Sequence, residues 1–162
     1  MAGIGEAAVA GGPLEGGVQG VSLVHNDDVP WVPLAKPLSE CTVGLFTTAG
    51  LYIEGEQESF DSSNIEGDRS TRLLPADVDP GRLRIAHDRF DHTVAEADHD
   101  SVFPVDRLRE RVTERILGGF HDGTVSMSGH NPRADRVAEE TAPAVMRVFQ
   151  DAGVDAVLFV PV

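Results

Sequence analysis

Short apolar stretches, separated by polar ones, predict a sheet of short strands. The stretches 42–50 and 155–162 are apolar and rich in β-branched residues, and each is typical of a buried strand. A shorter strand is expected at 84–87, and a short strand or loop at 124–129. The stretch 51–82 is polar and rich in turn-forming residues, so it is expected to be a long loop.

Two stretches repeat apolar residues at helical spacing. They predict helices near 105–117 and 133–151, the second ending at Gly153, two residues before the last strand. Their expected buried stripes are Val105, Leu108, Val112 and Ile116 in the first helix, and Val137, Thr141, Val145 and Val148 in the second. A tight helix–glycine–strand unit favours an α/β fold, a mainly parallel sheet with helices on both faces, as in an incomplete doubly wound domain.

Pro143 falls inside the second predicted helix. A proline there removes one backbone hydrogen bond and is expected to kink the helix. Glu139 and Glu140 lie just before it. They either point into a pocket at the kink or form a solvated face.

The length of 162 residues suits one domain, which we expect to span 21–162. The first twenty residues are rich in Gly and Ala and lack the features of a secretory signal, so 1–20 is expected to be a disordered leader. The segment 21–39, with three prolines and Trp31, is expected to be an extended arm that packs over the domain.

Charge and cysteine content narrow the classes of function. There are 27 acidic and 13 basic residues, a net charge of −14, which argues against a nucleic-acid partner. No apolar run is long enough to cross a membrane, so we expect a cytoplasmic protein. Cys41 is the single cysteine, which excludes an internal disulfide, and its place before a strand suggests a structural role.

The segment from His87 to Asp100 is the densest group of chemically active residues. It holds three histidines together with several carboxylates. Imidazole and carboxylate groups can bind a divalent metal or transfer protons near neutral pH. One interpretation is an acid–base site made of His87, Asp91 and Asp98, or a divalent metal held by His87 and Asp91. The other is a solvated acidic loop, which the spacing favours because it matches no compact ligand motif.

Arg69 and Arg72 form a second candidate site within the segment 67–72. Two guanidinium groups can hold a carboxylate in a forked geometry that lysine does not offer. The alternative is an internal salt bridge to one of the many nearby acids.

Six short segments follow one another in a distinctive order between 47 and 158. They are Thr47-Thr48-Ala49-Gly50; Gly67-Asp68-Arg69-Ser70-Thr71-Arg72-Leu73-Leu74-Pro75; Ile85-Ala86-His87 with Phe90-Asp91 and Asp98; Val102-Phe103-Pro104-Val105-Asp106-Arg107-Leu108; Glu139-Glu140-Thr141-Ala142-Pro143; and Asp151-Ala152-Gly153-Val154-Asp155-Ala156-Val157-Leu158. In order and spacing they resemble the amino-terminal half of the glycine/sarcosine/betaine reductase selenoprotein B family, which also includes a D-proline reductase subunit. The resemblance covers roughly residues 40–162.

This resemblance implies a reductase that cleaves a carbon–nitrogen bond in a small amine or amino acid. In that family a selenocysteine or cysteine, located after the strand equivalent to 155–162, attacks the substrate carbon. On this view His87, Asp91 and Asp98 line the site, and Arg69 and Arg72 meet a substrate carboxylate or stabilise the loop.

The chain departs from the family pattern because it contains no selenocysteine and no paired cysteine. Three explanations stay open: an in-frame UGA read as a stop, a protein divided between two polypeptides, or a natural short relative with another task. The chain alone is expected to be inactive, with no cofactor of its own. We expect its terminal strand to associate with a partner subunit or a second copy, because an uncovered apolar strand is adhesive. The competing hypotheses are a non-catalytic subunit that forms half of a composite site, and a small metal-binding module.

Overall fold

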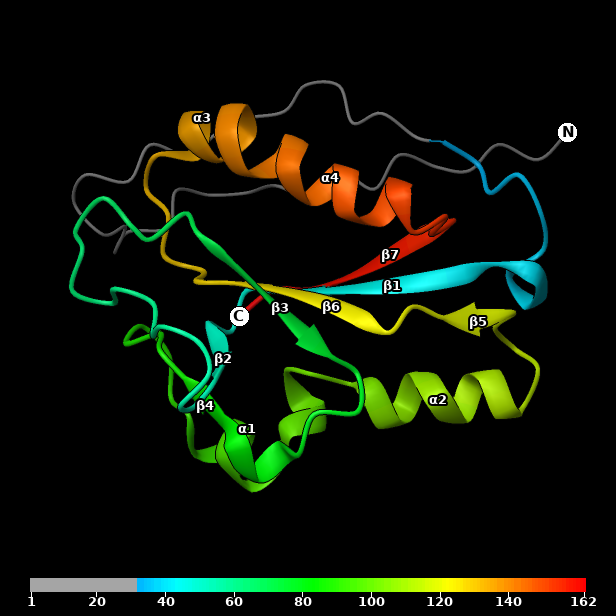
Figure 1. The fold of residues 1–162 in the computed structure, drawn as a ribbon, viewed down its shortest axis with the longest axis horizontal. Coiled ribbons are helices and arrows are strands. Elements are labelled where there is room, and N and C mark those ends of the chain that lie inside the picture. The colour runs from blue at the N-terminus through cyan, green and yellow to red at the C-terminus, as the bar shows by residue number, and fades with distance from the viewer. Residues whose placement is uncertain (1–31) are drawn as a thin grey trace, which may run out of the picture.

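The computed structural model describes residues 32–162. The expected leader at 1–20, and the part of the expected arm that includes Trp31, lie outside the described residues. The described part has an α/β fold, as predicted, in which a mainly parallel sheet carries helices on both faces (Figure 1). No helix within 32–162 is long and apolar enough to cross a bilayer.

Strand β1 (Thr42–Thr47) is the centre of the sheet and confirms the strand expected at 42–50. It pairs in parallel with β7 (Ala156–Val160) along one side. Along its other side it pairs in parallel with β5 (Gly119–Phe120) and then with β6 (Gly123–Met127). Strand β3 (Thr71–Pro75) closes the far edge, antiparallel to β6.

The side chains of β1 alternate between two apolar clusters because successive residues of a strand face opposite sides. Leu45 faces the cluster that contains Leu108 of α2 (Val105–Thr113). Phe46 faces the cluster that contains Phe149 of α4 (Ala142–Asp151). Figure 1 shows these two helices on opposite sides of the sheet. Both faces of β1 are therefore buried, which explains its nearly continuous apolar sequence.

The prediction of a long loop at 51–82 is wrong. Two strands interrupt it: β2 (Leu51–Ile53) pairs with β4 (Leu83–Ile85) in a second, two-stranded antiparallel sheet, and β3 pairs with β6. Both pairings join residues far apart in the sequence. In β3 only Leu74 is buried and the adjacent Leu73 is exposed, so the sequence does not show the alternation that predicts a strand. β4 confirms the strand expected at 84–87.

The first predicted helix is shorter than expected. α2 ends at Thr113 rather than 117, and Arg115 follows with a φ of 61°, a left-handed conformation that ends the helix. Ile116, expected in the buried stripe, is therefore exposed, and Leu117 is buried in its place. Short helical segments complete this part of the chain: α1 (Thr93–Ala97) and 3-10 turns at Leu38–Glu40, Pro80–Arg82 and His99–Ser101.

The second predicted helix is present but interrupted, as Pro143 predicted. α3 (Ala134–Arg136) leads into a π-helical turn (Val137–Thr141), and α4 begins directly after it. Pro143 thereby falls in the first turn of α4, where a missing N–H leaves no hydrogen bond unmade. Val148, expected to be buried, is 38% exposed, and Phe149 takes its place in the core.

The terminal strand is also less buried than its sequence predicted. Among the described residues β7 pairs only with β1, so it is an edge strand. Leu158 is 41% exposed and Phe159 is 63% exposed, although the Phe159 ring still packs against Phe46 at 5.0 Å between centroids.

Candidate functional site

The carboxyl ends of the three parallel strands β1, β6 and β7 meet at Gly129. A Cβ atom built on Gly129 would lie 2.6 Å from Nε2 of His87, 2.8 Å from the carbonyl oxygen of Val162 and 3.0 Å from that of Thr48. The backbone of Val162 also donates to Oγ1 of Thr48 at 2.9 Å. In open α/β sheets ligands bind beyond the carboxyl ends of the strands. His87 therefore lies where this fold class places its chemistry.

The imidazole of His87 is buried, and only one of its two ring nitrogens has a hydrogen-bond partner among the described residues. Its side chain is 4% exposed. Its Nδ1 accepts a hydrogen bond from the backbone N–H of Arg89 at 3.2 Å, so the neutral ring carries its proton on Nε2. That Nε2 has no hydrogen-bond partner among the described residues. Burial, together with the nearby His92 and His130, lowers the pKa of His87 below its ordinary value and keeps the ring neutral.

Two further aromatic side chains order the segment after β4. The Phe90 ring meets His87 edge-on at 5.2 Å between centroids and lies 4.6 Å from His92. Nε2 of His92 donates to the carbonyl oxygen of His87 at 2.7 Å. The imidazole of His87 is thus held in place by its own loop, and its Nε2 makes no hydrogen bond to any part of the chain that the structure describes.

The two predicted carboxylates do not join His87 through any hydrogen bond or ion pair in the described chain. Oδ1 of Asp91 accepts from both the N–H and the hydroxyl of Thr93 at the start of α1, and these bonds lower the pKa of Asp91. Oδ1 of Asp98 accepts from the N–H of Asp100 and caps the following 3-10 turn. Their catalytic roles stay predictions, and the contacts that they make are those of capping residues.

The metal alternative for His87 and Asp91 also stays a prediction. Within 32–162 no group of three or more His, Cys, Asp or Glu side chains is placed to hold a metal ion.

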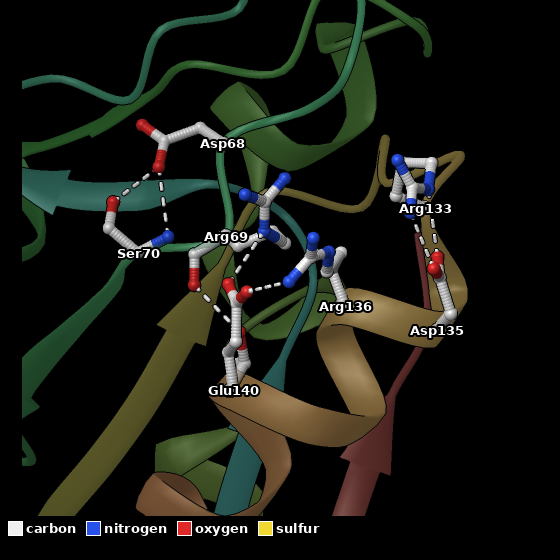
Figure 2. A network of polar contacts seen from close by, with 8 residues as sticks. Asp68, Arg69, Ser70, Arg133, Asp135, Arg136 and Glu140 are labelled. Carbon is white, nitrogen blue, oxygen red and sulfur yellow. Dashed lines mark hydrogen bonds and ion pairs between the residues drawn. The ribbon is translucent and has the colours of Figure 1, made fainter.

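Arg69 lies beside the π-helical turn. Its Nε donates to Oε2 of Glu140 at 3.2 Å, and its carbonyl oxygen accepts from the hydroxyl of Thr141 at 3.0 Å (Figure 2). The other carboxylate oxygen of Glu140 accepts from Arg136 at 3.1 Å. The internal salt bridge considered from the sequence is therefore present at Arg69.

Arg72 stabilises the loop that precedes β3. Its guanidinium donates to the carbonyl oxygens of Glu58, Ser59 and Thr71 and to the hydroxyl of Ser70. Its Cζ also lies 4.3 Å from the ring centroid of Phe60. These contacts match the loop-stabilising role considered for Arg72.

Gly67 begins the segment 67–72 that carries Arg69 and Arg72, here called the arginine loop, and it packs against residues that follow β6. It has a φ of +81°, and a Cβ atom there would overlap the carbonyl oxygen of His130 and lie 2.7 Å from Oδ1 of Asn131. The loop therefore packs against the residues that directly follow Gly129. The segment 129–131 is thus approached by His87 at Gly129 and by Gly67 at His130 and Asn131.

The sequence offered Glu140 as a pocket or surface residue but did not show that it pairs with Arg69, and it did not show that Gly129 and His130 approach His87. His130 is half-buried and close enough to lower the pKa of His87. One signal could have found the first cluster: Gly129 and His130 directly follow a strand, at the end where α/β sites lie.

The lowered pKa of His87 gives a pH dependence of stability. An unfolded histidine titrates near about 6.5. Because the folded pKa is lower, the unfolded chain binds the extra proton first as the pH falls. The contribution of His87 is complete above about pH 6.5 and is lost as the pH falls through the folded value. Urea unfolding of His87→Asn should show a shallower loss of stability over this window; parallel curves for both proteins would contradict the expectation.

The fold and this strand-end cluster define an α/β protein whose candidate site holds a buried histidine at the carboxyl ends of parallel strands. The family model for glycine/sarcosine/betaine reductase selenoprotein B matches residues 18–161. The chain belongs to this family, as the resemblance of its motifs predicted.

Curated relatives support the same assignment. The D-proline reductase subunit gamma of Acetoanaerobium sticklandii is 29% identical over 128 residues, which cover 79% of this chain and 51% of the relative. The glycine reductase complex component B subunit gamma of Carboxydothermus hydrogenoformans is 30% identical over 133 residues, 82% of this chain and 30% of the relative. The betaine reductase complex component B subunit beta of Peptoclostridium acidaminophilum is 27% identical over 142 residues, 82% of this chain and 30% of the relative. The chain thus spans about half the length of the first relative and less of the others. No solved structure matches it.

Proposed function

We propose that this chain is a selenoprotein B-like component, or a part of one, in a reductase that cleaves a carbon–nitrogen bond. Its substrate is a small amine or amino acid of the glycine, sarcosine, betaine or proline type. The observation that carries the proposal is the buried Nε2 of His87, which has no hydrogen-bond partner within residues 32–162 and lies at the carboxyl ends of three parallel strands, in a chain of this family.

The reaction needs a nucleophile that these residues do not offer. Cys41, the single cysteine, is buried at the amino end of β1, whereas His87 lies at the carboxyl end. In the proposed reaction a selenolate or thiolate from outside these 162 residues attacks the substrate carbon. A C–Se or C–S bond forms as the C–N bond breaks, and the amine leaves with the electron pair.

A second thiolate then attacks the selenium or sulfur of that adduct. A Se–S or S–S bond forms, and the carbon takes up a proton. The substrate thereby gains two electrons, and the thiol pair is oxidised by two. His87 would act in these steps by donating or accepting a proton at Nε2, and Arg69 would hold the substrate carboxylate. Arg72 would keep the arginine loop in shape.

The edge strand β7 favours a partner subunit as the source of the nucleophile. Its exposed Leu158 and Phe159 lie at the edge of the sheet, next to the strand end that carries the site. An apolar, unpaired edge is a template for the addition of another strand. The relatives are named as subunits of reductases or of reductase complexes, which agrees with a multi-subunit assembly.

Turnover by the assembled protein tests this proposal. The chain is co-expressed with the products of the genes that flank its own, purified, and supplied with a dithiol and each of glycine, sarcosine, betaine and D-proline. We expect consumption of one of them, with the matching amine product, by the assembly and little or none by the 162 residues alone. Brisk turnover by the isolated chain, or inactivity of the assembly toward all four, would refute the proposal.

A further inference from the structure

Two consecutive residues of the π-helical turn hold Arg69 at both ends. Thr141, which is buried, fixes the main chain of Arg69 through its hydroxyl, and Glu140 meets the Nε of the guanidinium. Single π-helical turns are frequent at functional sites. The sequence supports the distortion by placing Pro143 two residues after the turn, in the first turn of α4.

Glu140 divides its carboxylate between two arginines. One oxygen is bound by Arg69 at 3.2 Å and the other by Arg136 at 3.1 Å, and Figure 2 shows the carboxylate between the two guanidinium groups. The side chain of Glu140 is 48% exposed. Each contact is single and solvent-exposed, and pairs of this kind are weak.

The guanidinium of Arg69 keeps its forked end available. Its two terminal nitrogens have no hydrogen-bond partner among the described residues, because only Nε meets Glu140. Arg69, Glu140 and Thr141 line one surface cavity of about 450 Å³ together with the backbone of the arginine loop. The cavity is large enough for an amino acid of the expected size.

We propose that Glu140 is an internal competitor that sets how tightly Arg69 binds a ligand carboxylate. A ligand carboxylate engages the forked end of Arg69 through two hydrogen bonds and displaces Glu140, which stays paired with Arg136. The inference rests on the proposed role of Arg69 in binding a substrate carboxylate. It adds Glu140 as the residue that lowers the affinity of Arg69 for that carboxylate by competing with it.

The chain offers a matched control for this competition. Glu139 precedes Glu140 in the same π-helical turn and makes no ion pair in the described structure. Glu139→Gln and Glu140→Gln therefore change the net charge by the same amount, but only the second releases Arg69. Glycine betaine and choline serve as the probes, because they share a trimethylammonium group and differ in the carboxylate.

Binding is measured by NMR titration of the 162-residue protein, following the Nε–H resonance of Arg69, which Arg69→Lys identifies by its loss. We expect Glu140→Gln to bind glycine betaine about threefold more tightly than Glu139→Gln does. Choline should leave the Arg69 resonance unchanged in every variant.

Two results would overturn the proposal in distinguishable ways. If Glu140→Gln and Glu139→Gln bind glycine betaine equally, and choline leaves the Arg69 resonance unchanged, then Glu140 does not compete and Arg69 keeps its proposed role. If glycine betaine and choline act alike, or neither binds, then Arg69 does not recognise a carboxylate and the competition is refuted with it. The role of His87 is decided separately, by turnover of the assembly.

Discussion

Leu45→Ala is expected to lower the free energy of unfolding by about 2–5 kcal/mol. Leu45 is fully buried at the centre of β1, the strand that pairs with three others. Removing its side chain loses the transfer free energy of the deleted atoms and leaves a cavity between the sheet and α2. The loss is measured by urea unfolding followed by circular dichroism.

Leu158→Ala is the control for this prediction. Leu158 is the register partner of Leu45 on β7 and is 41% exposed at the edge. The same deletion there should cost about 1 kcal/mol or less, because much of the side chain already contacts water. Equal losses at the two positions would mean that β7 is covered in solution and that the sheet extends beyond it.

His87→Gln is expected to reduce turnover of the assembled reductase by about 10²-fold or more. The amide of glutamine can still donate a hydrogen bond near the position of Nε2, but it cannot transfer a proton at neutral pH. A loss confined to kcat, with KM and the circular dichroism spectrum unchanged, would show proton transfer rather than a packing role.

His99→Gln is the matched control. His99 belongs to the same histidine-rich segment but lies in the 3-10 turn that Asp98 caps, and it lines a different cavity. Turnover should change little. A comparable loss in both variants would indicate a general defect of the segment, and full activity of His87→Gln would remove His87 from the mechanism.

The sequence predicted the fold best where one segment decides its own structure. The apolar run of β1 and the helix that begins at Val105 are visible locally, and Pro143 predicted the break before α4. The pattern failed where a distant pairing decides. β3 is a strand because β6 lies beside it, although only Leu74 of its five residues is buried. Likewise, β7 reads as a buried strand, whereas its exposure depends on which strands flank it in space.

The same contrast holds for the candidate site. The segments 87–100 and 67–72 offered His87 and Arg69 as candidates, because imidazole and guanidinium groups carry recognisable chemistry. Spacing could not show that Asp91 and Asp98 use their carboxylates to cap short helical segments. It also could not show that Gly129, His130 and Glu140 approach these residues, since each approach joins segments more than 40 positions apart.

Because Cys41 is buried, this chain should not react with thiol-labelling reagents while it is folded. Its thiol is 1% exposed and donates to the carbonyl oxygen of Pro37, at the far end of β1 from His87. Alkylating reagents such as iodoacetamide act on accessible thiolates and selenolates. Alkylation of the folded assembly would therefore mark the attacking residue itself, and mass spectrometry of the modified peptide would identify the polypeptide that supplies it.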